Sequence, residues 1–554
     1  METSGTLTAS LNRVVDAHPT RIAMFDTGRS GAPTVTYEQL AAEVDAVAGV
    51  LHGLGLERGD VLCNWLPNIR EWMALQFAAA RLGVLIVNLN TRFRSRELHD
   101  ILSTTQAAAI VIPTGFLTID FVGITREVIG AGSPSGWQDD WPHLRAVLGV
   151  DASSDPRAGA AQAAAAEHDL EVVDLASAAG AAGSPPSAVG GPDDPVDAFT
   201  TSGTTGAPKL ATHTQRGVAL HSAYVAEAFD LQPGDRMLAA LPLCGVFGFS
   251  GSMAAILAGA GLVLQPAFDA GSAAAWFREA EITHAYGPDT MLRAIVDAAE
   301  DPDLLRSWRA GAFANFSGDG VAFARRVEAS LGVRMRGVYG SSEVFGLMSI
   351  WPEEAAPEER HQGGGRPVSP DIAVRVTDPE SGDTLPPGRD GEIQIRGYVV
   401  TAGYLGNEAA SAAAFTDDGW FRTGDLGQVR EDGMLIYHSR LGDSLRLGGY
   451  LVDPAEIEGH LLAHPEVVSA VVVGAQQAGV GDAAVAFVVA AAEHGLDEAG
   501  LGQYCRGQIA AFKIPTRIEF LDELPTVEGP NGVKIHRNEL RQRAQQLLDR
   551  TATS

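Results

Sequence analysis

Cysteine is scarce in this chain, which has three among its 554 residues. Cys63, Cys244 and Cys505 lie far apart and match neither the spacing of a metal site nor that of a disulfide framework. Structural disulfides concentrate in oxidising compartments, so their absence from the sequence pattern favours a reducing one. A fold held together by cross-links is therefore not expected.

Long apolar runs are also missing. The two longest, Met253 to Leu264 and Val467 to Ala492, are short or interrupted by Gly, Gln and Asp. A membrane-spanning helix needs about 20 consecutive apolar residues. The first ten residues have no basic start followed by an apolar run, so a signal peptide is not expected. We therefore expect a cytoplasmic protein without a membrane partner.

Basic residues are few relative to acidic ones, with 40 Lys and Arg against 69 Asp and Glu and a formal net charge of −29. Nucleic acids and anionic membranes attract clustered Lys and Arg, so neither is an expected partner. A small phosphate-bearing ligand stays open, because a pocket needs only a few well-placed cations. The length is too great for one compact core, and the 45% hydrophobic content can fill more than one.

The first part of the chain alternates between helical and strand patterns. Helices are expected at 36–54 and 69–82, and strands at Val61–Cys63 and Val84–Leu89. This alternation is typical of an α/β architecture whose sheet is covered on its faces. The stretch from Asp151 to Pro192 is dense in Ala, Gly, Ser and Pro. We predict a surface excursion there, partly helical near 160–167, and assign it no chemistry.

The last hundred or so residues are expected to form a small separate unit. Its predicted elements are strands at Val468–Gly474 and Val485–Ala491, a helix at Leu496–Ile509, a strand at Arg517–Leu521 and a terminal helix at His536–Leu548. The segment Tyr437–Asp443 before it is a plausible hinge. No internal repeat is visible in the sequence.

The strongest local motif runs from Thr200 to Lys209, with the sequence Thr-Thr-Ser-Gly-Thr-Thr-Gly-Ala-Pro-Lys. Six of these ten residues are Ser, Thr or Lys donors, and two glycines let backbone N–H groups approach a ligand. Such a loop can surround the oxygens of a triphosphate with hydroxyl, amide and ammonium donors. It does not fit the Walker pattern. Taken by itself, a polar surface turn explains it equally well.

Further motifs follow in order, and together with this loop the chain resembles the adenylate-forming superfamily of acyl- and aryl-CoA synthetases, adenylation domains and beetle luciferases. The matching segments are Thr36–Leu40, Pro242–Gly248, Tyr339–Glu343, Gly391–Ile393 with Gly403-Tyr404, Trp420–Asp425, Arg440–Glu458 and Gly532–Lys534. The resemblance covers residues 10 to 545. It implies a large N-terminal multi-sheet α/β domain, residues 1–440, and a small mobile C-terminal α+β domain, residues 441–554.

The resemblance implies an ATP and AMP site. Its expected residues are Thr201, Ser202, Gly203, Thr204, Thr205, Lys209, Gly318, Asp319, Gly320, Tyr339, Gly340, Ser341, Ser342, Asp425 and Arg440. In the family, the loop holds the β- and γ-phosphates, and the tyrosine of the Tyr-Gly motif stacks on adenine. Asp425 carries two acceptor oxygens suited to both ribose hydroxyls, and Arg440 adds a donor nearby.

Two residues are implied for catalysis, Lys534 and Glu343. Glu343 matches the family's Mg²⁺ carboxylate, a hard oxygen ligand suited to a hard cation. Lys534 matches a mobile lysine that stabilises the negative charge developing on the α-phosphate. Asp443 matches the hinge about which the small domain rotates after adenylation. Taken alone, Lys534 is a solvated loop lysine and Asp443 a turn aspartate, and only their family positions favour the functional interpretation.

The second half-reaction is harder to predict, because the sequence departs from the family at positions that bear on this step. Gly245 replaces a residue, commonly His, that stands between the acid and the second-substrate tunnel. Gln215, Leu210 and Gly442 replace the usual His, Gly and Lys. Gly448-Gly449, which in relatives lies by the pantetheine arm, is retained. By family position the acid pocket is lined by Phe247, Phe249, Ser250, Tyr286, Ser317 and 345–348, although each is as compatible with ordinary core packing.

The implied activity is an ATP-dependent ligase that activates a carboxylic acid, aryl or short to medium acyl, as acyl-AMP and transfers it to CoA, with Mg²⁺ as cofactor. The alternative keeps adenylation but changes the second step: a carrier-protein loader, an amide-forming ligase, or a diazotase that activates nitrite for an aryl amine. A binding protein without catalysis is disfavoured, because Lys534, Glu343 and Asp425 are all present. The sequence leaves the acid and the oligomeric state open, a homodimer included.

Overall fold

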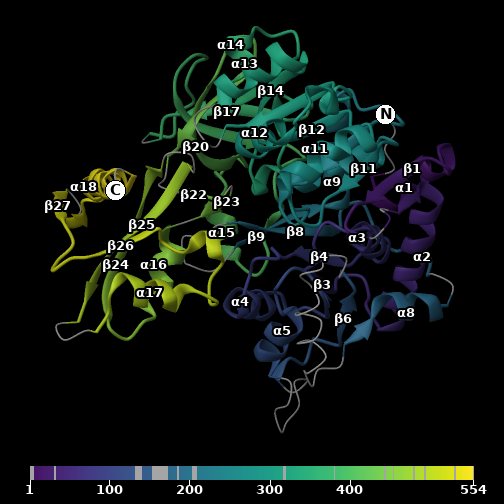
Figure 1. The fold of residues 1–554 in the computed structure, drawn as a ribbon, viewed down its shortest axis with the longest axis horizontal. Helices are drawn as coiled ribbons and strands as arrows, with labels where there is room; N and C mark the ends of the chain where they lie inside the picture. Colours follow the sequence, from purple (N-terminus) through teal and green to yellow (C-terminus); the bar gives the residue numbers. More distant parts are fainter. Residues whose placement is uncertain are drawn as a thin grey trace.

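The computed structural model describes a large platform and a small C-terminal domain (Figure 1). The described residues are 5–29, 31, 33–130, 140–152, 172–183, 186–201, 209–315, 320–379, 381–441, 445–448, 450–452, 454–477, 481–491, 495–529 and 532–552. Both domains mix helices with strands. The predicted fold class is therefore confirmed, whereas the boundary after residue 440 stays a prediction.

The platform contains two large sheets. The thirteen strands of the first are, in spatial order, β17 (Ala373–Thr377), β18 (Gly391–Arg396), β20 (Phe421–Val429), β21 (Leu435–Arg440), β16 (Gly364–Pro367), β15 (Ser349–Ile350), β14 (Arg334–Tyr339), β13 (Ala310–Ala314), β12 (His284–Pro288), β10 (Arg236–Ala239), β11 (Gly261–Leu264), β1 (Ile22–Asp26) and β2 (Thr34–Thr36). Strands β10 to β14 pair in parallel, and the β15–β21 end is antiparallel.

The second sheet carries the predicted phosphate loop. Its eight strands are β19 (Gly403–Tyr404), β9 (Lys209–Thr214), β8 (Pro195–Thr201), β4 (Leu85–Asn88), β3 (Val61–Asn64), β5 (Ala109–Pro113), β6 (Ala146–Val150) and β7 (Val173–Asp174). Pairing of β19 with β9 brings residues 403 and 404 beside the end of that loop. Because β3, β4 and β5 are buried parallel strands, they read in the sequence as continuous apolar runs.

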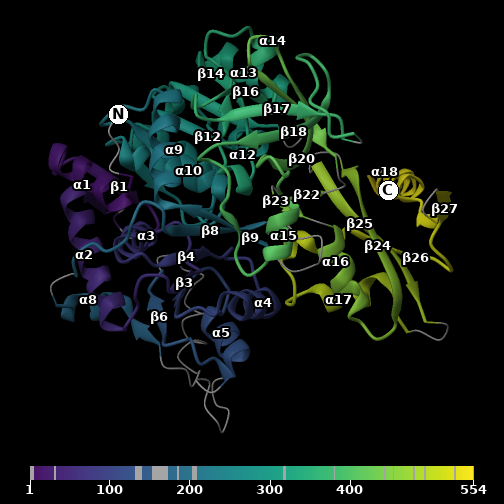
Figure 2. The same ribbon diagram turned by 180° about the vertical axis from the view of Figure 1, so that it is seen from behind.

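Helices cover both sheets of the platform (Figure 2). They are α1 (Leu7–Ala17), α2 (Tyr37–Gly53), α3 (Arg70–Leu82), α4 (Ser95–Thr105), α5 (Phe121–Ile129), α8 (Leu175–Ala181), α9 (Gln215–Ala228), α10 (Val246–Leu257), α11 (Ala270–Glu279), α12 (Asp289–Ala298), α13 (Gly320–Leu331), α14 (Pro357–Arg360) and α15 (Glu408–Ala413). Short 3₁₀ turns form η2 (Pro302–Leu305) and η3 (Ser342–Val344). Thr36 caps α2 through two reciprocal hydrogen bonds with Gln39, so the helix begins at Tyr37, one residue after the predicted start.

The small domain has its own hydrophobic cores on the two faces of one sheet. Its sheet contains β24 (Val467–Gln477), β25 (Gly481–Ala490) and β26 (Arg517–Phe520), and its two hairpins are β22 (Leu445–Leu447) with β23 (Tyr450–Val452) and β27 (Thr526–Gly529) with β28 (Gly532–Ile535). Its helices are α16 (Pro454–Leu462), α17 (Glu498–Cys505), η4 (Ala511–Lys513) and α18 (Arg537–Ala552).

Two sequence predictions require correction. The helix expected at Leu496–Ile509 is shorter, because Asp497 caps its first turn and Gly507, at φ +80°, lies in the left-handed region. The Ala-rich stretch is not wholly an excursion, since β7 extends the second sheet and α8 packs on α2. The helix expected near 160–167 lies outside the described residues.

Candidate active site

Three polar side chains of the platform, from Glu343, Tyr404 and Lys209, meet beside η3, which follows β14. The Tyr404 hydroxyl donates to Glu343 Oε1 at 3.1 Å, and the Thr401 N–H donates to the Glu343 carbonyl at 2.7 Å. Lys209 Nζ lies 5.0 Å from the centre of the Tyr404 ring. The structure thus brings the predicted metal carboxylate and the predicted phosphate lysine to one tyrosine. Tyr404 was expected only as the end of a motif.

The predicted phosphate loop connects β8 to β9. Thr201 and Lys209 face each other as the last pair of this antiparallel hairpin, so both ends of the loop are fixed by the sheet. Ser202, Gly203, Thr204 and Thr205 lie outside the described residues, as do Ser317, Gly318 and Asp319 of the second predicted loop. Gly320 begins α13, and its N–H donates to the Asn315 side chain at 3.0 Å.

The segment that follows β14 turns back tightly on itself. A Cβ atom on Gly340 would lie 1.2 Å from the Gly346 carbonyl oxygen, so no side chain fits at this position. The Gly346 N–H also donates to the Ser341 carbonyl at 2.9 Å. The Tyr-Gly motif therefore needs its glycine for a close backbone approach. Ser341 and Ser342 follow it, both partly exposed.

Tyr339 and Asp425 form a second polar group of the site. The Tyr339 hydroxyl donates to Asp425 Oδ2 at 2.7 Å, and the Tyr339 ring lies 5.3 Å from that of Tyr437. Asp425 is buried and pairs in register with Arg440 across β20 and β21. The side chain of Arg440 lies outside the described part of the chain. The backbone nevertheless places three of the expected nucleotide residues, Tyr339, Asp425 and Arg440, at one corner of the first sheet.

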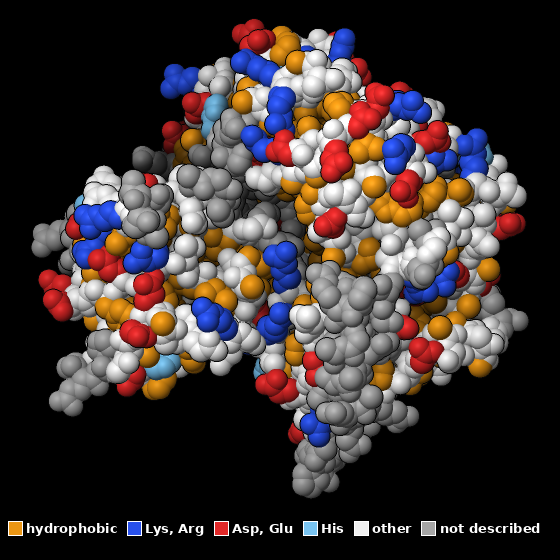
Figure 3. All heavy atoms as spheres, in the orientation of Figure 1, with side chains coloured by type: hydrophobic (Ala, Val, Ile, Leu, Met, Phe, Trp, Pro, Cys, Tyr) orange, Lys and Arg blue, Asp and Glu red, His pale blue; other side chains and the backbone are white. Residues whose placement is uncertain are grey.

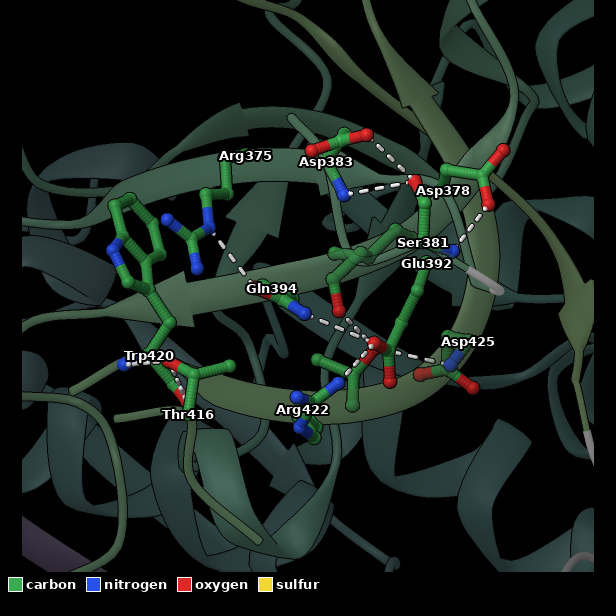
Figure 4. A network of polar contacts seen from close by, with 12 residues as sticks. Arg375, Asp378, Ser381, Asp383, Glu392, Gln394, Thr416, Trp420, Arg422 and Asp425 are labelled. Carbon is green, nitrogen blue, oxygen red and sulfur yellow. Dashed lines mark hydrogen bonds and ion pairs between the residues drawn. The ribbon is translucent and has the colours of Figure 1, made fainter. Parts of the chain in front are cut away.

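A network of polar contacts holds the strand that carries Asp425 (Figure 4). Glu392 accepts hydrogen bonds from Gln394 at 3.0 Å and from Arg422 at 3.4 Å. The Thr423 hydroxyl donates to the Ile393 carbonyl at 2.6 Å and accepts from the Asp425 N–H at 3.0 Å. These contacts tie β20 to β18, so the carboxylate of Asp425 is positioned by the sheet and not by a loop.

The predicted acid-pocket residues gather around the start of α10. Phe249 is fully buried and packs edge-on against Phe199, with ring centres 5.1 Å apart. The Tyr286 hydroxyl donates to the Gly248 carbonyl at 2.8 Å, and the Tyr286 ring lies 5.4 Å from the ring of Phe247. Burial raises the pKa of the Tyr286 phenol above its ordinary value. Ser250 is also buried on α10.

Gly245 forms the N-cap of α10 and has room for a side chain. Its φ is −101°, and among the described residues an added Cβ would meet only the Pro242 carbonyl oxygen, at 3.5 Å. Asn68 fixes the preceding segment, because its amide donates to the carbonyls of Ala239 and Leu241 and its oxygen accepts from the Leu243 N–H. The sequence analysis did not single out Asn68, because this contact joins residues more than 170 apart.

His213 is a site residue that the sequence analysis missed. Its Nε2 lies 2.7 Å from the carbonyl oxygen of Ser342, directly before Glu343. Burial lowers the pKa of His213 to about 4, so the ring is neutral at pH 7. A neutral imidazole N–H that donates to this carbonyl fixes the backbone of η3. The one available signal was a histidine in the strand that follows the phosphate loop.

Two hairpins of the small domain lie at different distances from the platform. The β27–β28 hairpin, whose second strand contains Lys534, lies at the outer edge of this domain in both Figure 1 and Figure 2. In this arrangement the hairpin lies on the side of the small domain away from the platform, and the Lys534 side chain lies outside what is described. Gly448, in the β22–β23 turn, faces Phe512 and Arg92. Asp443 and Gly449 are not among the described residues.

A recess separates the small domain from the platform, with Lys and Arg side chains at its edge (Figure 3). Within the described ranges, no group of three or more His, Cys, Asp or Glu side chains is arranged to hold a metal ion.

No helix in the described part of the chain is long and apolar enough to cross a membrane.

Comparison with known proteins identifies the family. The chain matches the AMP-binding enzymes over residues 11–405 and the AMP-binding enzyme C-terminal domain over residues 456–528. It is 28% identical to the mitochondrial medium-chain acyl-CoA ligase of Danio rerio, over 98% of this chain and 89% of that protein. It is 31% identical to the 2-hydroxy-7-methoxy-5-methyl-1-naphthoate–CoA ligase of Streptomyces carzinostaticus, over 94% of this chain and 90% of that protein.

Solved structures agree with these relatives. The ATP-bound MatB from Rhodopseudomonas palustris superposes with a TM-score of 0.67 at 26% identity, covering 99% of this chain and 100% of that chain. The same platform and small C-terminal domain are thus found in an enzyme that binds ATP. The chain belongs to the AMP-binding enzymes of the adenylate-forming superfamily, and it is an AMP-forming enzyme of the acid–CoA ligase type.

Proposed function

We propose that this enzyme activates an aryl or short to medium acyl carboxylic acid with ATP and transfers the acyl group to CoA. In the first step the acid oxygen attacks the α-phosphorus, pyrophosphate leaves, and acyl-AMP forms. In the second step the CoA thiolate attacks the acyl carbon, and AMP leaves. The observation that carries this proposal is the convergence of Lys209, Glu343, Tyr339 and Asp425 at neighbouring edges of the two platform sheets.

Each of these groups has a part in the first step. Lys209, at the end of the phosphate loop, supplies a cation for the β- and γ-phosphates, and Asp425 supplies acceptors for the ribose. Glu343, whose carboxylate contacts the same tyrosine as Lys209, is a hard oxygen donor that would hold a Mg²⁺ ion. That ion would neutralise charge on the phosphates when bound. Tyr404 and Thr401 hold the Glu343 segment in place.

The position of the small domain supports a division of labour between its faces. Lys534 belongs to a hairpin at the outer edge, whereas Gly448 lies beside the platform residue Arg92. We infer that this arrangement belongs to the second step, and that rotation of residues 441–554 about Asp443 delivers Lys534 for the first. The lysine would then stabilise the charge that develops on the α-phosphate.

The function is tested by incubating the protein with ATP, Mg²⁺ and a panel of aryl and acyl acids, with and without CoA. AMP release that requires an acid, together with a thioester detected by mass spectrometry, would support the proposal. Acid-dependent AMP release without a thioester would refute the CoA step and leave an amide-forming or carrier-loading enzyme. AMP release only with nitrite and an aromatic amine would establish the diazotase instead.

The division of labour predicts the behaviour of Lys534→Ala. Adenylation should fall by roughly 10²–10⁴-fold, because the charge on the α-phosphate loses its counter-ion. Transfer from synthetic acyl-AMP to CoA should stay within a fewfold of the unmodified enzyme. Pyrophosphate release and thioester formation measure the two steps separately. Loss of both steps in a folded variant would refute the assignment.

A further inference from the structure

Two buried histidines lie against one aromatic ring behind the Tyr-Gly-Ser-Ser-Glu segment. His213, on β9, and His221, on α9, are both buried. Their ring centres lie 4.5 Å and 5.2 Å from that of Phe345, which directly follows η3. Phe345 also packs on Phe249, one of the predicted acid-pocket residues, at 5.8 Å. The histidine pair therefore adjoins the pocket in which the acid is expected.

The polar atoms of these two histidines are satisfied to different degrees. His213 has the Ser342 carbonyl as a partner, as described above. His221 Nδ1 lies 3.5 Å from the Tyr398 hydroxyl, at the limit of a hydrogen bond. His221 Nε2 is buried and has no hydrogen-bond partner among the residues that the structure describes. Burial lowers the pKa of His221 to about 3, so the ring is neutral and offers one donor and one acceptor.

A second unsatisfied polar atom approaches the same segment from α10. Ser250 is fully buried, and its hydroxyl has no hydrogen-bond partner within the described ranges. This hydroxyl lies against Gly346, since a Cβ on that glycine would be 2.8 Å from Ser250 Oγ. Helices α9 and α10 pack on each other, so His221 and Ser250 flank Phe345 and Gly346 from neighbouring helices.

The backbone between these two atoms is strained. Phe345 has a φ of +56°, in the left-handed region that non-glycine residues rarely adopt, and Gly346 follows at +77°. Buried polar atoms without partners and backbone outliers both cost free energy, and both are concentrated where proteins bind ligands. A substrate that supplies the missing partners would account for the unpaired atoms of His221 and Ser250.

We propose that His221 and Ser250 select acids that carry a hydroxyl or carbonyl group remote from the carboxylate. The inference rests on the proposed function, because it names the class of acid that the site takes. A substrate hydroxyl can both donate and accept, so it can satisfy His221 Nε2 in either tautomer and Ser250 Oγ as well. An unsubstituted acid would leave these atoms unpaired, and such sites reject the analogue that lacks the polar group.

The experiment uses stable sulfamoyl-adenosine analogues of matched acyl-adenylates. The pairs are benzoyl with 3- and 4-hydroxybenzoyl, and hexanoyl with 5-oxohexanoyl and 6-hydroxyhexanoyl, and titration calorimetry gives each Kd. At least one polar analogue should bind the unmodified enzyme tenfold or more tightly than its unsubstituted partner. His221→Leu should abolish this ratio while the Kd of the unsubstituted analogue changes less than threefold. Ser250→Ala should reduce the ratio, and His221→Gln, which keeps a donor and an acceptor, should restore part of it.

A matched control separates recognition from packing. His284 is also a buried histidine, but its ring nitrogens lie within hydrogen-bond distance of Thr283 and of the Phe229 carbonyl. His284→Gln should leave the ratio unchanged. The inference would be overturned if His221→Leu weakened the binding of polar and unsubstituted analogues equally. It would also be overturned if the unmodified enzyme bound the two kinds of analogue with the same Kd. Discrimination between the analogues in an enzyme that forms no thioester would instead refute only the proposed CoA transfer.

Discussion

Asn68 shows how much a single buried side chain contributes to the site. It is 4% exposed and makes three hydrogen bonds to the segment that leads into Gly245, at 2.8 to 2.9 Å. Asn68→Ala leaves two carbonyls and one N–H buried without these partners. We therefore expect the free energy of unfolding to fall by about 3 kcal/mol, measured by urea denaturation.

The control for this variant is Asn407, whose side chain caps α15 by accepting from the Ala410 N–H. Asn407→Ala removes one capping bond at a site where water can replace it. A loss of about 1 kcal/mol is expected. Equal losses in the two variants would contradict the proposed role of Asn68 as the anchor of the segment before α10.

The buried ring of His221 makes folding sensitive to pH. Its pKa is about 3 in the folded chain, against 6.5 for an ordinary histidine. Below pH 6.5 the unfolded chain binds a proton that the folded chain does not, so stability is lost as the pH falls from 6.5 towards 3. Between pH 7 and pH 5 the unmodified protein should lose about 2 kcal/mol more than His221→Gln. Urea denaturation at both values measures this difference.

His99 provides the comparison for this pH effect, because its side chain is 59% exposed on α4. His99→Gln should keep the pH dependence of the unmodified protein. If His221→Gln and the unmodified protein lost stability in parallel, the neutral buried state of His221 would be refuted.

At the scale of elements, alanine substitutions at two glycines of the family motifs are expected to differ in their effect on activity. Gly340→Ala places a Cβ on the Gly346 carbonyl, so the turn after β14 cannot close. Adenylation, measured as acid-dependent pyrophosphate release, should fall by at least 10²-fold, a loss of about 3 kcal/mol of transition-state stabilisation. Gly245→Ala meets only an ordinary contact with Pro242 and has a permitted φ.

We therefore expect Gly245→Ala to keep adenylation and the thermal melting temperature of the unmodified protein. Both variants add one methyl group to a glycine of the same site, so only the local space differs. Comparable losses of pyrophosphate release in the two variants would contradict this interpretation of the turn after β14.

Elements with a strong local pattern were predictable from the sequence. Helix α2 follows from its apolar spacing and its capping box, and β24 and β25 follow from their continuous apolar runs. The end of α17 was not predictable from spacing alone, because Asp497 and Gly507 stop the helix on either side. Strand β7 was missed because two residues in an Ala-rich stretch are too few to show the alternation of apolar and polar side chains that indicates a strand. Its pairing with β6 depends on the rest of the sheet.

The candidate site could be predicted only for residues that belong to short contiguous motifs in the sequence. The motifs with Lys209, Tyr339, Glu343 and Asp425 could be recognised as segments, and the structure brings these four to neighbouring edges of the sheets. The contacts of His213 and Asn68 could not be recognised. Each joins a side chain to a backbone group more than 120 residues away, and no local pattern encodes such a distance.

At the scale of the whole molecule, the small domain is held to the platform by a buried charged cluster. Lys513 lies with its Nζ 2.7 Å from Glu456 within its own domain and 3.7 Å from Glu97 at the start of α4. Glu97 also accepts from the Ala510 N–H at 3.3 Å. Both Lys513 and Glu97 are less than 10% exposed, so solvent screens their attraction only weakly.

Glu97→Gln should loosen this interface without disturbing either domain. Lys513 keeps Glu456, but the platform loses its charge, so the docked arrangement becomes less populated. If docking serves the second step, transfer from synthetic acyl-AMP to CoA should slow about tenfold, which corresponds to ~1.4 kcal/mol, whereas adenylation should change less than twofold. Small-angle X-ray scattering should show a larger radius of gyration. Glu498→Gln, which alters an ion pair with Arg517 inside the small domain, should leave both measurements unchanged. Slower adenylation with unaltered transfer in Glu97→Gln would reverse the assignment of this arrangement to the second step.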